Sequence, residues 1–251
     1  MNQIETCNAI KHECDQFLDL LATAGLDAPV PSCPDWTVAE LAHHLGGVHR
    51  WAQLLVETHA QSPQRRPPLE VDISDRKALS AWFAEGSSAL LATLEAAQPE
   101  APMWAWGKDQ RVAFWIRRQL HETMMHRVDL ELAVGAVVDI DPLVASDNID
   151  ELLELLPYAV QFQPNAANLR GVGSLHLHAT DPGLEANGEW LIRYTEDGFE
   201  WAHQHGKGDV ALRGPLTELA LVLNRRHELP GRTEVLGDAA VLEHWLANSA
   251  L

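Results

Sequence analysis

The segment QLHETMMHRVDLELAVG, residues 119–135, has the pattern of an amphipathic helix and carries a glutamate and a histidine four residues apart. Each residue of a helix advances by about 100°, so Glu122 and His126 lie nearly above one another, whereas His121 points well away from His126. Such a pair can bind a metal ion from one side, and a third ligand must then come from a facing helix. Three protein ligands with one place left for water or substrate are typical of catalytic zinc.

The segment ELAHHLGGVHRW, residues 40–51, offers His43, His44 and His49 as candidates for the third ligand. The alternative is that these side chains are ordinary polar groups on solvated helix faces, because thirteen histidines are spread over the chain. Spacing alone favours this alternative. The same two interpretations, a role at a metal site or an ordinary surface position, apply to Arg127 and Asp129. They can orient a metal ligand or bind an anion, but a solvated face with local ion pairs is the more common case.

These residues need helices to position them, and the first part of the chain provides the pattern. Apolar spacing and end signals predict helices over 4–25, 37–59, 75–97 and 111–134. Thr37 begins TVAE, a capping box with Glu40 that marks the start of the second helix. Four long helices joined by short or moderate connections predict a four-helix bundle.

The pattern changes after a further helix predicted over 141–163. GSLHLHATD alternates strictly, GEWLIRYTEDGFEWAHQH reads as a hairpin with its turn at EDG, and DVALRG and RTEVLGD read as short strands. PLTELALVLNRR, 215–226, and AAVLEHWLAN, 239–248, read as helices. We therefore predict an α+β fold, with a helical domain over 1–160 and a small α+β domain over 165–251.

Composition excludes several classes of partner. Acidic residues outnumber basic ones 36 to 18, and the formal net charge of −18 disfavours nucleic acids and anionic membranes. No signal-peptide pattern or membrane-spanning run is present, and the three cysteines fit reduced thiols, so we expect a cytoplasmic protein. We expect a monomer or dimer, a choice that the sequence does not determine. The sequence has no GxGxxG, P-loop or GxSxG motif, which leaves nucleotide cofactors and serine hydrolysis without support.

Two segments carry a family resemblance. PSCPDWTVAELAHHLGGVHRW, 31–51, and HETMMHRVDLELAVG, 121–135, resemble the mycothiol-dependent maleylpyruvate isomerase family, a branch of the DinB/YfiT-like metalloproteins. GDVALRGPLTELALVLNRR, 208–226, and TEVLGDAAVLEHWLA, 233–247, resemble the C-terminal α+β domain of that family. The resemblance thus implies a DinB-like metal-binding four-helix bundle followed by that domain.

The resemblance also implies a site. The family's W-T/S-V-x-x-x-x-x-H-L pattern places its first metal ligand on His44, and its Glu and His before an R-x-D fall on Glu122 and His126. The aspartate of the R-x-D, which matters in the family, falls on Asp129. A catalytic arginine of the C-terminal domain corresponds to Arg225 or Arg226.

The chemistry implied is thiol-dependent. Mycothiol is the low-molecular-weight thiol of actinobacteria, and Zn²⁺, or another divalent metal, can hold its sulfur as thiolate. Addition of the thiolate to the double bond of a small cis-enone diacid allows rotation, and expulsion of the thiol gives the trans isomer. Without expulsion the product is a conjugate, so the enzyme is an isomerase or an S-transferase. Two alternatives remain, a metal-dependent hydrolase and a non-catalytic metal- or thiol-binding stress protein on the same bundle.

Overall fold

The computed structural model describes residues 1–229 and 231–250. The chain forms two compact units, Met1–Val138 and Asp139–Leu251. The division lies before the helix that begins at Pro142, whereas the sequence places it at 160–165. That helix packs against a helix of the second unit, which explains the earlier division.

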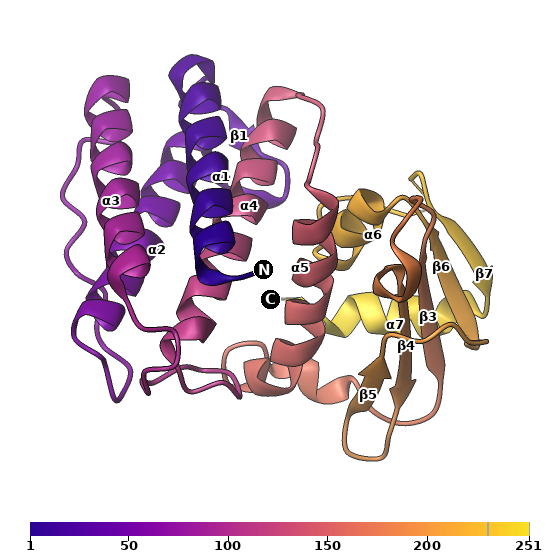
Figure 1. Ribbon diagram of the computed structural model, residues 1–251. Helices are drawn as coiled ribbons and strands as arrows, with labels where there is room; N and C mark the ends of the chain where they lie inside the picture. Colours follow the sequence, from indigo (N-terminus) through magenta and orange to yellow (C-terminus); the bar gives the residue numbers. More distant parts are fainter. Residues whose placement is uncertain (230, 251) are drawn as a thin grey trace. The chain divides into compact units, whose positions relative to one another are not determined.

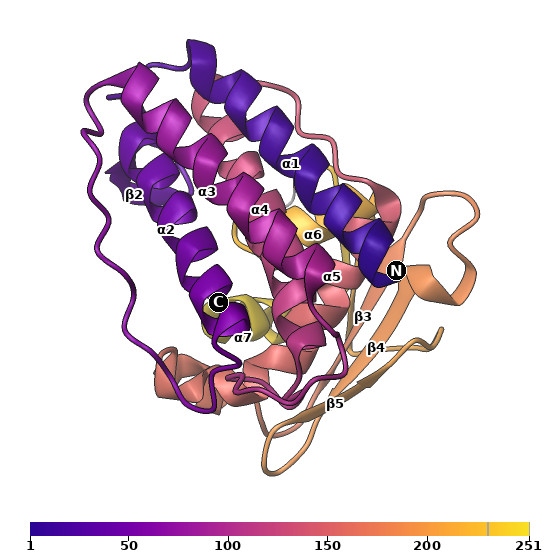
Figure 2. The same cartoon turned by 60° about the vertical axis from the view of Figure 1, so that its left-hand side comes forward.

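The first unit is a bundle of four long helices (Figures 1 and 2). Helices α1 and α2 each pack against both α3 and α4, so α2 and α4 are direct neighbours. The predicted four-helix bundle is confirmed. The helices are α1 (Gln3–Thr23), α2 (Val38–Glu57), α3 (Arg76–Ala96) and α4 (Val112–Val134).

Helix α2 begins where the sequence predicts, at the capping box. The Thr37 hydroxyl accepts from the Glu40 amide, and the Glu40 carboxylate accepts from the Thr37 amide at 2.8 Å. A short antiparallel pair, β1 (Pro29–Val30) and β2 (Cys33–Thr37), leads into this helix. The sequence predicts only a connection between the first two helices here, because strands this short carry no alternating pattern.

Helix α4 is buried around most of its circumference between residues 119 and 131, including polar positions such as Gln119, Arg127 and Asp129. It packs against α1, α2 and β1, which together enclose it. The expectation of a solvated polar face on this helix is therefore wrong. Arg127 lies in the interior, where Glu13 at 2.5 Å and Glu131 at 2.6 Å pair with its guanidinium.

The second unit opens with α5 (Pro142–Leu155), which continues as a 3₁₀ helix over Leu156–Gln161. A single helix over 141–163 is thus a wrong prediction, because Pro157 lacks an amide hydrogen and interrupts the α-helical hydrogen bonds. Helix α6 (Leu216–Leu223) likewise ends before the predicted 226, with Arg225 at a φ of 64° just beyond it. The last helix is α7 (Ala239–Asn248).

A five-stranded sheet forms the rest of this unit, with the strand order β5-β4-β3-β6-β7 (Figure 1). The predicted hairpin over 188–205 is confirmed as β4 and β5, and β3 and β6 form a parallel pair between antiparallel neighbours. The strands are β3 (Ser174–Ala179), β4 (Glu189–Tyr194), β5 (Phe199–Ala202), β6 (Val210–Gly214) and β7 (Glu234–Gly237).

Helices pack on one face of this sheet. The apolar side chains of Leu175 and Leu177 on β3 share that face with Trp190 and Ile192 on β4, and all four are fully buried. Trp190 donates to Asp150 of α5 at 2.6 Å, which places α5 on the same face. In the described part of the chain, no helix has both the length and the apolar character needed to cross a membrane.

Candidate metal centre

Helices α2 and α4 bring His44, Glu122 and His126 together. Nε2 of His126 lies 3.3 Å from Oε1 of Glu122, and Nε2 of His44 lies 3.8 Å from the same oxygen. The ligand atoms of the three residues all lie within 4.8 Å of one another, and the two imidazole rings meet edge to face at 5.0 Å. Two imidazoles and a carboxylate are the donor set of many zinc, iron, nickel and manganese sites, so the residues fit a divalent cation.

Asp129 orients the imidazole of His126. Its Oδ2 lies 2.8 Å from Nδ1 of His126, and its Oδ1 accepts from the Ser32 hydroxyl at 2.6 Å. The Asp129 side chain is fully buried, so these contacts are not weakened by solvent. A proton held on Nδ1 leaves Nε2, the atom that faces Glu122, as the nitrogen that can bind a cation.

Arg118 fixes the other half of the Glu122 carboxylate. It donates to Oε2 at 2.7 Å, one helical turn before the glutamate, while Oε1 faces the two histidines. Burial by itself raises the pKa of Glu122, but Arg118, His126 and His44 outweigh it and hold the pKa well below its usual value. Glu122 is therefore ionised at neutral pH, as a metal ligand must be.

The pKa of His126 is shifted in the opposite direction to that of Glu122, because carboxylates surround it. Burial lowers its pKa, but hydrogen bonds with Asp129 and Glu122 and the charges of these carboxylates raise it to about 9. A proton on Nε2 and a cation on Nε2 exclude one another, so cation binding at this atom displaces the proton. Binding should therefore weaken as the pH falls.

Trp36, on β2, covers the two imidazoles from one side. Its indole ring lies 4.5 Å from the His44 ring and 6.2 Å from the His126 ring, measured between centroids. In the sequence, Trp36 is the first residue of the family's W-T/S-V pattern but is given no contact with the histidines, and nothing in the sequence points to Ser32. Both residues belong to the β1–β2 segment, which carries no local signal that places it beside α4.

The other histidines of α2 point elsewhere. His43 stacks on Trp82 at 5.5 Å and its Nε2 lies 3.3 Å from the carbonyl of Leu69. His49 is completely buried, with Nε2 3.0 Å from the Thr123 hydroxyl, and burial lowers its pKa to about 3. Of the three candidates on α2, the structure thus brings only His44 to Glu122 and His126.

Arg225 and Arg226 belong to the second unit, at the end of α6. Arg225 is exposed and has a left-handed backbone, and burial of part of its side chain lowers its pKa. Arg226 donates to the carbonyl of Asn224 at 2.7 Å. The candidate metal centre itself consists of first-unit residues.

Comparison with known proteins gives consistent matches over both units. The family model described as the mycothiol maleylpyruvate isomerase N-terminal domain matches residues 7–131, and the model of the C-terminal domain of the same family matches residues 144–244. A comparison with curated protein sequences gives no significant match.

Solved structures show the same fold. Crystal structures of the mycothiol-dependent maleylpyruvate isomerase and of a histidine-to-alanine mutant of it match with TM-scores of 0.63 and 0.64. Each match covers 94% of this chain and 93% of the other, at 14% sequence identity. The fold is therefore shared over nearly the whole length of both chains.

Proposed function

The chain belongs to the mycothiol maleylpyruvate isomerase family, and from this and the geometry of the His44–Glu122–His126 cluster we propose that it is a zinc-dependent, mycothiol-using enzyme. The substrate class is a small electrophile with an activated double bond, of the maleylpyruvate type. The reaction is cis–trans isomerisation or, where the thiol is retained, S-transfer. The observation that carries the proposal is the convergence of the three ligand atoms from α2 and α4.

When bound, Zn²⁺ supplies the Lewis acidity that keeps a thiol sulfur as thiolate near neutral pH. The protein's own residues prepare the site for this. Asp129 holds Nδ1 of His126, so the ring presents Nε2, and Arg118 holds Oε2 of Glu122, so the carboxylate presents Oε1. Trp36 packs beside both histidine rings, with its indole centroid 4.5 Å from that of His44.

Arg225 or Arg226 is proposed to bind the carboxylates of the substrate, because a guanidinium matches a carboxylate with two parallel hydrogen bonds. A cationic clamp is useful in a chain with a net charge of −18, which otherwise repels a diacid. Arg225→Met and Arg226→Met should be compared, and the variant that lacks the carboxylate-binding arginine should have a KM for a diacid that rises much more than its kcat falls. An unchanged KM in both variants would remove these residues from the proposal.

A metal-dependent hydrolase with Glu122 as general base fits the contacts less well. Arg118 and the two histidines stabilise the ionised carboxylate and make it a weak base. Thiol dependence separates the two functions. Turnover of a cis-enone diacid only when mycothiol is present supports the isomerase, and thiol-independent hydrolysis supports the hydrolase.

Metal content tests the centre directly. Wild-type protein and the His44→Ala and His126→Ala variants should be compared by mass spectrometry after purification without added metal. Each variant should carry one zinc fewer per chain than the wild type. His43→Ala is the matched control, because it removes the neighbouring histidine of the same helix and should keep the metal. Wild-type metal content in both ligand variants would overturn the assignment.

A further inference from the structure

The second face of the sheet in the second unit carries a group of histidines. Side chains alternate along a strand, and the helix-facing positions of β3 are Leu175 and Leu177. His176 and His178 therefore share the opposite face. On β4, Glu189 pairs directly with His178, so its carboxylate lies on the same face beside both histidines.

The segment between β5 and β6 crosses this face. β5 is the edge strand and β6 lies beyond β3, so the chain must pass over β4 and β3 to reach it. It passes closely. A Cβ at Gly206 would lie 2.7 Å from the Leu191 side chain, and one at Gly208 would lie 3.0 Å from the His176 backbone nitrogen. Glycine at these positions lets the segment lie flat on the sheet, which brings His205 over His176.

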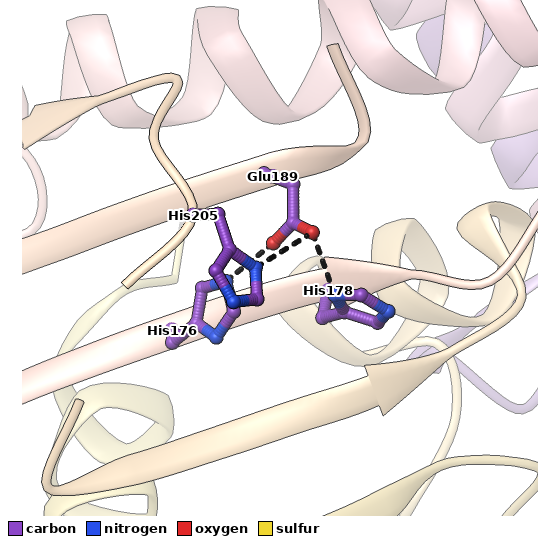
Figure 3. A group of neighbouring side chains, drawn as sticks. All are labelled: His176, His178, Glu189 and His205. Atoms are coloured by element: carbon purple, nitrogen blue, oxygen red, sulfur yellow. Dashed lines mark hydrogen bonds and ion pairs between the residues drawn. The ribbon is translucent and has the colours of Figure 1, made fainter. Parts of the chain in front are cut away.

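Three imidazoles converge on the carboxylate of Glu189 (Figure 3). Oε1 lies 2.7 Å from Nδ1 of His178 and 3.2 Å from Nδ1 of His205, and Oε2 contacts Nε2 of His176. One ligand atom from each of the four residues lies within 4.8 Å of the other three. His176 and Glu189 are mostly buried, whereas the side chain of His205 is 77% exposed.

We propose that His176, His178, Glu189 and His205 form a second metal site, which binds a divalent transition-metal ion and prefers Zn²⁺. Imidazole nitrogen and carboxylate oxygen are the ligands of this class of ion. A zinc tetrahedron with bonds of about 2.0–2.1 Å has edges of about 3.3 Å. The nitrogens of His178 and His205 lie 2.7 and 3.2 Å from Oε1 of Glu189, and all four ligand atoms lie within 4.8 Å of one another, so side-chain rotations can bring them onto such a tetrahedron.

The number of ligands indicates the role of this site. Four protein ligands complete a tetrahedron and leave no position for substrate, which is the arrangement of structural zinc sites. The ion would link the crossing segment, through His205, to β3 and β4. It should therefore stabilise the second unit, because a ligand that binds only the folded state raises stability by mass action.

This site is independent of the proposed function. Its residues belong to Asp139–Leu251, whereas His44, Glu122 and His126 belong to Met1–Val138. The alternative to a metal is a network in which the three imidazoles donate hydrogen bonds to the Glu189 carboxylate. That network needs no ion, and the experiment below distinguishes the two.

The experiment is a zinc titration of the protein, monitored by isothermal titration calorimetry, after a chelator has removed any bound metal. The wild type should bind two Zn²⁺ per chain, and Glu189→Gln, His205→Ala and His126→Ala should each bind one. The Glu189→Gln/His126→Ala double variant should bind none. His12→Ala removes an exposed histidine of α1 and should bind two.

Folding of the variants is checked by circular dichroism. The side chain of His205 is largely exposed, so His205→Ala should stay folded, and a loss of zinc binding in this variant reports the loss of a ligand rather than unfolding. Removing a hydrogen-bond partner of a ligand already costs about 10- to 100-fold in metal affinity, so loss of this ligand should cost at least that much. Zn²⁺ should raise the unfolding temperature of His126→Ala but not of His126→Ala/His205→Ala.

The outcomes separate the two proposals. If Glu189→Gln and His205→Ala bind as much zinc as the wild type, with equal affinity, the second site is overturned whatever happens at His126. If these variants bind one ion fewer while His126→Ala binds as many as the wild type, the second site is supported and the metal centre of the proposed function is overturned. Co²⁺ bound to His126→Ala should show the intense visible absorption of a tetrahedral ion, and a weak octahedral spectrum would overturn the four-ligand site.

Discussion

Asp129 Oδ2 lies 2.8 Å from Nδ1 of His126, three residues earlier on the same helix, and the Asp129 side chain is fully buried. The aspartate thereby sets which nitrogen of the ring can bind a cation. Its own position depends on Ser32, which donates to the other carboxylate oxygen from outside the helix. A contact within one helix is thus fixed by a residue far away in the sequence.

Asp129→Asn should weaken metal binding at the first-unit centre by about 10- to 100-fold. The neutral amide has no negative charge to hold the proton on Nδ1 of His126, and it cannot accept hydrogen bonds from both Ser32 and His126. The bundle should stay folded, since the side chain keeps its shape. A competition titration with a chromophoric chelator measures the affinity. Asp19→Asn, at an exposed position of α1, is the matched control. Equal affinity in the two variants would show that Asp129 does not act on the metal.

His49 should make the protein less stable in acid. Burial lowers its pKa in the folded state to about 3, whereas its pKa in the unfolded chain is near 6.5. Between these values only the unfolded state binds the proton, so this contribution to stability is present above pH 6.5 and is lost as the pH falls toward 3.

The His49→Gln variant isolates this effect. Its free energy of unfolding, measured by urea titration between pH 7 and 4, should fall less steeply than that of the wild type, by up to about 1.4 kcal/mol per pH unit. Parallel pH profiles for the two proteins would mean that His49 takes up its proton in the folded state.

Only one of the three cysteines should react quickly with a thiol reagent in the native protein. Burial raises the pKa of Cys14 to about 12 and that of Cys7 to about 11, and both side chains are buried. Cys33 is half-buried. A reagent reaches Cys33 more easily than the two buried thiols, although its Sγ donates to Asp129 at 4.0 Å, so the native protein at pH 8 should show one thiol that reacts before the other two, and denatured protein should show three. Fast labelling that persists in Cys33→Ser would contradict this.

Gly46→Ala should destabilise the bundle. The added Cβ would lie 2.2 Å from the Trp82 ring, which Arg50 covers at 3.8 Å and His43 stacks on at 5.5 Å, so the indole cannot shift freely. Overpacking of this kind costs about 1–3 kcal/mol. Gly25→Ala is the control, because its Cβ would meet only ordinary contact at 3.7 Å. Urea denaturation of the two variants gives the comparison, and equal midpoints would refute the prediction.

The sequence by itself determines the local features of this protein. The capping box at Thr37 and Glu40 marks the start of α2, and four-residue spacing places Glu122 and His126 on one face of α4. Strict alternation in SLHLHA likewise places His176 and His178 on one face of β3. These features depend on interactions between near neighbours in the chain, which residue types and spacing specify directly.

Only the tertiary structure decides which residues meet. Spacing leaves His43, His44 and His49 equivalent, the family resemblance selects His44, and the packing of α2 on α4 turns His44 toward Glu122. The same packing buries Asp129 beside Ser32, and the strand order carries His205 across the sheet to Glu189. Helix rotation and strand order depend on how whole surfaces fit together, and no local pattern contains that information.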